Sequence, residues 1–358
     1  MLSTFTSAFA ADTKVNGRLY ADWNMDMTDG ADNANSFNIN RAYVTVKSKL
    51  SDYTSVRITS DISSTDAFDG YSIILKYGYI DWMPQFSNGV LKARFGLQPT
   101  LYIDDMNGLW GRRYLEKTIG DKNKFLTSSD LGLSAFMNLG EKGKSGYVAL
   151  QILNGTSYSH VDEMNSNKDF GVFAHLMPFS SNEDLKGSHL LGQFYAGTQN
   201  VSLETEIDSS VSPVVVIAND ASQYKRQIAS VGGLLAYKNS FDFGFDANFL
   251  TTGKGYDTTG AEVADVKSSG ISFFGTVYLA GLSSNENSFG KTLNLFGRFD
   301  ILDPNTDVDN DGKSLMIVGV ECAPTKGFKA SLNFRNTSYE LDGKDSESHI
   351  FLNTLFKF

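Results

Sequence analysis

The chain has 358 residues and a net charge of −10, with many glycines (33) and aromatic residues (13%) and only 6 prolines. The acidic balance excludes a nucleic-acid-binding protein, which needs a basic face, and the single cysteine, Cys322, excludes an internal disulfide framework and a cysteine-based zinc site. There is no run of about 18 apolar residues, so the sequence predicts no membrane-spanning helix.

The first residues are typical of the end of an export signal. Ala8, Phe9 and Ala10 fit the small-x-small pattern that precedes signal cleavage. We therefore expect residues 1–10 to be a signal remnant and residues 11–358 to form one domain. The segment has no basic leading region and its apolar stretch is short, so a disordered tail is the alternative.

The rest of the chain divides into sixteen segments with the alternation or composition of β-strands. Most are about 9 to 14 residues long, and a tilted strand needs roughly 9 to 11 residues to cross a bilayer. The expected strands are residues 14–25, 37–50, 54–62, 72–83, 90–98, 130–139, 146–154, 169–177, 189–198, 223–237, 241–251, 270–280, 292–302, 314–323, 328–337 and 349–358.

The connections between these strands alternate between long and short. Every connection after an odd-numbered strand is a long polar loop, whereas those after even-numbered strands include turns as short as "KNS" and "PTKG". All the long loops then emerge on one side, and both ends of the chain lie on the other. This arrangement is typical of outer-membrane barrels, which have long extracellular loops, short periplasmic turns and an even number of strands.

Residues along single strands alternate between apolar and polar types. Phe241, Phe243 and Phe245 fall on one face of their strand, and Asp242 and Asp246 fall on the other. The first face suits hydrocarbon, and the second is too charged for a packed protein core. We therefore predict an all-β fold, a 16-stranded antiparallel transmembrane β-barrel with a water-filled interior. Residues 72–83 alternate poorly, so their facing stays open.

The last strand, Ile350 to Phe358, alternates up to its terminal Phe, which resembles the assembly signal of outer-membrane barrels. The segments "RFGLQPTLYIDDMNGLWGRRYLEK", "SSDLGLSAFMNLG", "LQILNGTSY", "RFDILDPNTDVDNDG" and "VGVECAPTKGFKASLNF" are similar to a sixteen-stranded porin family related to the phosphate-selective porins O and P. The resemblance implies a trimeric porin in the outer membrane of a Gram-negative-type cell, with both termini periplasmic. It also implies contact with lipid and lipopolysaccharide, and passive diffusion of small hydrophilic solutes and ions, with a phosphate-type anion preference as a further expectation.

The third long loop, about residues 99–129, is the expected functional centre. It is long for a connection and too apolar for a disordered segment, since it carries Leu101, Tyr102 and Trp110. We expect it to fold into the lumen; the alternative is an external loop packed on its neighbours or on a trimer partner. The predicted pore constriction combines charged residues of this loop with arginines on inward-facing strand positions: Asp104, Asp105, Arg112, Arg113, Glu116, Lys117, Arg41, Arg57, Arg94 and Arg298.

The inward positions predict an asymmetric lumen. Early strands contribute mainly basic residues, including Arg18 and Lys47, whereas later strands contribute mainly acidic ones, including Asp246 and Glu321. Opposed charges across a narrow aqueous path select ions. For any single residue, solvation of the wall alone is the alternative interpretation.

One outer loop contains "DVDNDG", whose Asp307, Asp309 and Asp311 imitate the start of a calcium-binding loop. The twelfth position is Val318 instead of a bidentate glutamate, so a polar turn is favoured over a Ca²⁺ site. No other cofactor is expected.

Catalysis is not expected, because the four histidines are scattered and no G-x-S-x-G motif occurs. An outer-membrane hydrolase stays as a remote alternative. A barrel scaffold that sheathes a periplasmic or redox partner is another, and the long third loop counts against it.

Overall fold

The computed structural model describes residues 12–65, 70–201, 206–208, 215–217, 221–255, 262–282 and 289–358, so the signal remnant expected at residues 1–10 lies outside the described residues. The barrel strands are β1 (Asp12–Asp26), β2 (Asn35–Lys49), β3 (Thr54–Thr65), β4 (Gly70–Trp82), β5 (Leu91–Pro99), β6 (Ser129–Leu139), β7 (Gly146–Leu153), β8 (Asp169–Leu176), β9 (His189–Thr198), β12 (Lys225–Tyr237), β13 (Phe241–Thr252), β14 (Val266–Tyr278), β15 (Leu293–Asp303), β16 (Lys313–Thr325), β17 (Phe328–Tyr339) and β18 (Glu347–Lys357).

These strands form one closed antiparallel barrel in which each pairs with its neighbours in sequence and β1 pairs with β18. β12 follows β9 in the barrel, because β10 (Glu206–Asp208) and β11 (Val215–Ile217) form a separate two-stranded sheet in the loop between them. The 16-stranded antiparallel barrel predicted from the sequence is confirmed. The strand bounds agree closely; the start of β14 moves furthest, to Val266 from the expected residue 270.

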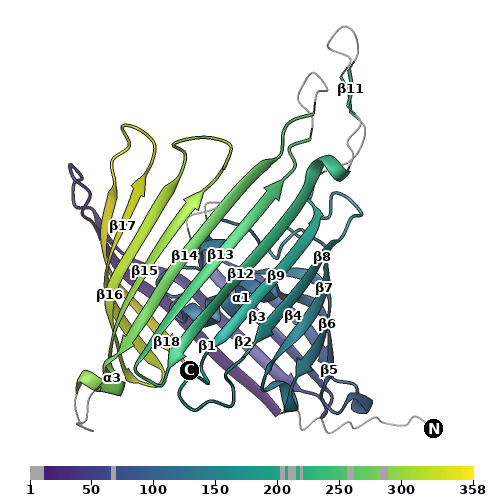
Figure 1. Ribbon diagram of the computed structural model, residues 1–358, viewed down its shortest axis with the longest axis horizontal. Coiled ribbons are helices and arrows are strands. Elements are labelled where there is room, and N and C mark those ends of the chain that lie inside the picture. The colour runs from purple at the N-terminus through teal and green to yellow at the C-terminus, as the bar shows by residue number, and fades with distance from the viewer. Residues whose placement is uncertain are drawn as a thin grey trace.

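The loops are sorted between the two rims as the sequence predicts. The sheet of β10 and β11 rises from one rim together with the long hairpin loops, and the short helix α3 (Leu279–Leu282) lies at the opposite rim (Figure 1). In the part of the chain that the structure describes, no helix is long and apolar enough to cross a bilayer.

The two faces of the wall differ sharply in polarity. Phe243 is 52% exposed on the outside, whereas Asp246 is 1% exposed on the inside. In β4 the pattern shifts at a bulge: Thr59 pairs with Tyr77 but Ser60 pairs with Leu75, so Lys76 is the extra residue. This bulge explains the poor alternation of residues 72–83, because outward positions are odd before Lys76 and even after Tyr77.

The barrel closes at a glycine that accommodates the terminal Phe. Gly17 and Phe358 exchange backbone hydrogen bonds of 2.9 and 3.2 Å. A Cβ atom at Gly17 would lie 2.1 Å from the Phe358 ring, so a larger residue at this position would displace the ring. The backbone pairing of β18 with β1 therefore extends to Phe358.

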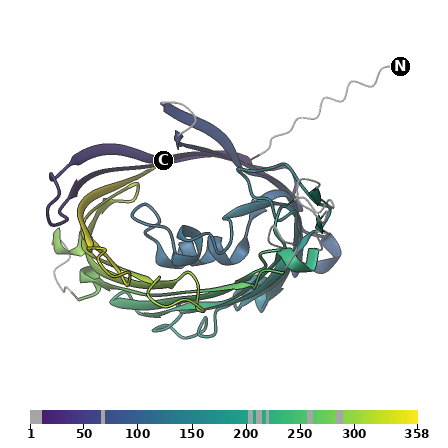
Figure 2. The same ribbon diagram turned by 90° about the horizontal axis from the view of Figure 1, so that it is seen from above.

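The long third loop lies inside the ring of strands (Figure 2). It contains two helices, α1 (Leu101–Trp110) and α2 (Ile119–Lys122), where the sequence predicted only an irregular loop. α1 begins after Thr100, which has extended backbone, and ends at Gly111, whose φ of 66° is the left-handed conformation that terminates helices. The helices lie nearer to the wall of β9 and β12–β14 than to that of β1 and β2 (Figure 2).

Candidate functional site

One face of the third loop is fixed to the wall formed by β13–β16, here called the covered arc. The Tyr102 hydroxyl donates to Asp246 (2.8 Å), and the Arg112 guanidinium donates to Thr276 (2.9 Å). Arg112 also forms an ion pair with Glu321 (3.4 Å), which accepts a 2.8 Å hydrogen bond from the Tyr114 hydroxyl. Asp246 and Glu321 of the covered arc therefore hold the loop and are buried beneath it.

Apolar contacts reinforce this attachment. Trp110, which is 1% exposed, packs edge-on against Phe274, with ring centroids 5.4 Å apart, and against Phe296 at 6.3 Å. Edge-to-face aromatic pairs contribute about 0.5–1.5 kcal/mol beyond the area that they bury. The aromatic residues from which the sequence analysis argued against a disordered loop thus pack against the inner wall.

A second set of contacts fixes α1 to β7–β9. Asp105 accepts a 2.8 Å hydrogen bond from the Tyr147 hydroxyl, and its carboxylate lies 2.6 Å from Nδ1 of His175. Nε2 of His175 lies in turn 2.8 Å from Nδ1 of His189. Asp105 is therefore engaged by the wall, although it is next to Asp104 in sequence.

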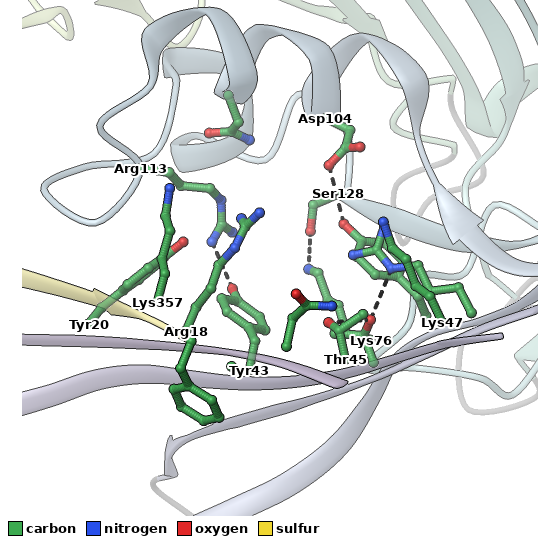
Figure 3. Close-up of a pocket in the computed structure, with 17 residues that line it drawn as sticks. Arg18, Tyr20, Tyr43, Thr45, Lys47, Lys76, Asp104, Arg113, Ser128 and Lys357 are labelled. Carbon is green, nitrogen blue, oxygen red and sulfur yellow. Dashed lines mark hydrogen bonds between the residues drawn. The ribbon is translucent and has the colours of Figure 1, made fainter. Parts of the chain in front are cut away.

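The free face of the loop borders a cavity of about 290 Å³ against β1–β4, here called the basic arc. Figure 3 shows Asp104 and Arg113 reaching into it from the loop, opposite Arg18, Lys47 and Lys76 from the wall. Its basic lining residues are Arg18, Lys47, Arg57, Lys76, Arg113 and Lys357.

Most of these cations have only neutral partners. Arg57 donates to Thr59 (3.1 Å) and stacks on the Tyr77 ring at 4.3 Å, and Lys76 donates to Ser128. Within the described part of the chain, Arg18, Lys47, Arg57, Lys76 and Lys357 have no carboxylate at ion-pair distance. Arg113 differs, since it pairs with Asp121 (3.3 Å) and donates to the Tyr43 hydroxyl (2.7 Å).

Among the described residues, Asp104 is the one acidic side chain that lines this cavity. Its only hydrogen bond among the described residues is a long one, 3.5 Å, from the Tyr77 hydroxyl. The Asp104 side chain is exposed on the lumen side of α1, but the protein around it reduces its solvation, and this desolvation, with the neighbouring Asp105, raises the pKa of Asp104 above its usual value. Nearby arginines, Arg57 first, oppose the rise.

The predicted constriction residues separate into two groups in the structure. Asp104, Arg57 and Arg113 line the 290 Å³ cavity, and Asp105 lines an adjoining cavity of about 510 Å³ that shares Asp104 and Arg113 with the first. Arg94 forms a two-pronged pair with Asp81 (2.7 and 3.0 Å) and lines a third cavity of about 340 Å³, which shares Arg57 with the first.

The others lie away from the first cavity. Arg41 is paired with Asp61, and Arg112 is 5% exposed behind the loop. Arg298 bonds to Asp300 (2.8 and 2.6 Å) and to the Lys117 carbonyl (2.7 Å). The side chain of Lys117 lies 4.0 Å from Asp121, and Glu116 pairs with Lys122 (2.7 Å) and lies 3.8 Å from Arg335.

The predicted constriction omitted four basic residues of the first cavity: Arg18, Lys47, Lys76 and Lys357. The alternation of their strands already placed Arg18, Lys47 and Lys357 on inward positions. Lys76 had no such signal, because the bulge that turns it inward also disrupts the pattern of β4.

The outer loop with Asp307, Asp309 and Asp311 forms an exposed turn in which the Asp307 backbone N–H donates to the Asn305 side chain (3.3 Å). Among the described residues, no three or more His, Cys, Asp or Glu side chains are grouped so that they could hold a metal ion.

Known proteins resemble this chain in fold but not in sequence. No protein-family model matches the sequence. No curated protein matches it either. The outer-membrane channel DcaP of Acinetobacter baumannii aligns over 100% of both chains with 12% identity and a TM-score of 0.65.

Two further solved structures give similar values. OmpT of Vibrio cholerae, an outer-membrane protein, aligns over 98% of both chains (9% identity, TM-score 0.63). An anion-selective porin from Comamonas acidovorans aligns over 97% of this chain and 100% of its own (8% identity, TM-score 0.62). At these identities the comparisons establish a shared barrel fold.

Proposed function

We propose that the protein is an outer-membrane porin, a water-filled channel for the passive diffusion of small hydrophilic solutes and ions, with a preference for anions. The observation that carries this proposal is a group of cations on the basic arc, Arg18, Lys47, Arg57 and Lys76, which line the 290 Å³ cavity and have no carboxylate partner among the described residues. Charged side chains that line a pore set its ionic selectivity.

The outer surface supports placement in a membrane. Large apolar side chains such as Phe37, Ile73 and Phe95 are 63% to 85% exposed around the barrel. A soluble monomer rarely exposes contiguous apolar surface on this scale. A closed barrel leaves no unpaired strand edge and so satisfies its backbone groups in lipid. By analogy with other such barrels, the long loops are extracellular and both termini are periplasmic.

The contents of the lumen favour a channel function over that of a scaffold that encloses a partner protein. The third loop occupies space inside the barrel that a partner would need. The 290 and 510 Å³ cavities beside the loop share lining residues. We extend the proposal to a homotrimer in contact with lipid and lipopolysaccharide. One solved structure of OmpT of Vibrio cholerae, with 12% identity and a TM-score of 0.59, is described as a trimer form.

Recording from purified protein in planar lipid bilayers tests the proposal. We expect stepwise conductance and, in a KCl gradient, a zero-current potential on the anion-selective side. Absence of conductance would refute the channel. A cation-selective potential would leave the channel but refute the anion preference. Exchange of chloride for phosphate, sulfate or acetate in the same recordings then identifies which anions pass.

A further inference from the structure

The 290 Å³ cavity presents opposite charges on its two sides. Asp104 and Arg113, the latter paired with Asp121, project from the loop, whereas the other basic residues project from the wall (Figure 3). The two sides lie close together, since Tyr77, on which Arg57 stacks at 4.3 Å, also donates a 3.5 Å hydrogen bond to Asp104. Yet Asp104 forms no ion pair with any described residue. The carboxylate and the cations of the wall are thus held apart across the cavity.

Lys76 gives an independent indication that this cavity accommodates a charged group. It is 2% exposed, and its described partners are all neutral: the Ser128 hydroxyl and the rings of Tyr158 (3.7 Å) and Tyr77 (5.9 Å). A buried ammonium without a counter-charge is costly. An anionic group in the cavity would supply the missing partner.

We propose that this cavity is a binding site for zwitterionic solutes, in which a carboxylate faces the basic arc and an ammonium group faces Asp104. The inference rests on the proposed channel and names one class of solute that passes through it. The excess of cations favours solutes with more than one carboxylate, such as acidic amino acids. The volume, about 290 Å³, is near the lower end of the range for ligand pockets, about 300–1,000 Å³.

The contacts of the two sides explain why neither charge is neutralised by the protein itself. The loop is fixed to the covered arc by Tyr102, Arg112 and Tyr114, so α1 cannot move across to close the gap. Arg57 is held by its stack on Tyr77, and Tyr77 also reaches toward Asp104. A solute with charges of both signs matches this separation, and the absence of tight pairing within the site suits release as well as entry.

L-Glutamate and glutarate provide a matched pair of probes, because both carry two carboxylates and only glutamate carries an ammonium group. The measurement is the concentration of each that half-blocks single-channel current, in the wild-type protein and in Asp104→Asn. Asp104→Asn is expected to reduce the preference for glutamate over glutarate by about three- to fivefold, the effect of one partly exposed ion pair.

Asp309→Asn is the control, since it removes the same charge from an exposed outer turn and should leave the ratio unchanged. An unchanged ratio in Asp104→Asn, or an equal change in both variants, would overturn the inference while the channel itself stands. If the wild-type protein carries no current, the channel proposal fails separately. The same ratio of affinities, measured by calorimetry on detergent-solubilised protein, then still tests the site.

Discussion

The basic and covered arcs of the barrel show the same alternation of inward and outward residues, yet their inward charged side chains have different partners. On the covered arc, Glu321 and Arg298 are 1% and 4% exposed and are bonded to the loop. On the basic arc, Lys47 and Arg57 face a cavity and have no carboxylate partner in the part of the chain that the structure describes. The side of the lumen on which the loop packs therefore decides whether a charged side chain bonds to the loop or faces a cavity.

Two consecutive residues show the same division within the loop. Arg112 points into the covered arc, where it meets Thr276 and Glu321, whereas Arg113 points across to Tyr43 on the basic arc. The two arginines carry the same charge and are adjacent in sequence, so charge alone does not distinguish them. Their surroundings predict separate consequences for stability and for selectivity.

Replacing Arg112 with Ala gives the largest expected effect. Removal of one partner from a buried ion pair typically costs about 3–5 kcal/mol, although Tyr114 and Lys329 still contact Glu321 and reduce the loss. We expect a lower urea midpoint of unfolding and noisier open-channel current as the loop loosens. Arg113→Ala is the matched comparison, with a smaller loss of stability and a shift of the zero-current potential toward cations. Equal unfolding midpoints for the two variants would contradict the division.

Neutralising the basic arc should change selectivity without changing stability. In the double variant Lys47→Gln and Arg57→Gln, the zero-current potential in a KCl gradient should move toward cation preference, because two cations without carboxylate partners leave the lumen. Lys326→Gln, in the exposed turn between β16 and β17, removes a charge outside the cavity and should leave the potential unchanged. If the double variant retains the wild-type potential, the basic arc does not control the ions that pass.

Much of the fold could be predicted because a barrel strand follows a local rule. Apolar and polar residues alternate, so the sequence alone locates sixteen strands and most inward side chains, including Arg18 and Asp246. The rule fails at Lys76, where a bulge adds one residue to β4 and reverses the alternation. No pattern in the sequence marks the bulge as clearly as the alternation marks the strand. The rule also says nothing about α1, which packs against β7–β9 as well as against the covered arc.

The candidate site was harder to predict, because pairing between charges depends on which groups meet across the lumen. The sequence places Arg57 and Arg94 on inward positions of early strands, but only the structure shows that Arg94 is bound by Asp81 whereas Arg57 has no carboxylate partner among the described residues. In the same way, Asp104 and Asp105 are neighbours with different partners. These differences arise from contacts between distant segments, which strand periodicity does not encode.

The pH dependence of ion selectivity tests the role of Asp104, on the side of the loop that faces the cavity. Because the pKa of Asp104 is raised, its carboxylate takes up a proton at a higher pH than an ordinary aspartate, whose pKa is about 4. As the pH falls from neutrality, the cavity loses this negative charge while its cations remain, so anion preference should increase before ordinary carboxylates titrate. Asp104→Asn should show stronger anion preference than the wild type at neutral pH and a smaller change on acidification. A wild-type potential that stays constant down to pH 4 would contradict this assignment.

The smallest expected effect concerns the outside of the covered arc, where Cys322 provides a natural probe. It follows Glu321, which is 1% exposed and points inward, and it shares parity with Val318 and Val320, which are 44% and 40% exposed on the outer face. In a lipid bilayer the thiol should face hydrocarbon or a neighbouring subunit, where a charged reagent enters only at high cost. We therefore expect slow labelling of Cys322 by a small negatively charged thiol reagent, and no change in conductance.

Thr45→Cys, made in a Cys322→Ser background, is the contrasting variant, since Thr45 lines the 290 Å³ cavity. Its thiol should react quickly, because the reagent reaches it through the water of the lumen and is attracted by the surrounding cations. Conductance and anion preference should both fall as the added negative group fills the cavity. Fast labelling of Cys322 with a matching loss of conductance would place it in the lumen, and the inward and outward assignment of β16 would then be wrong.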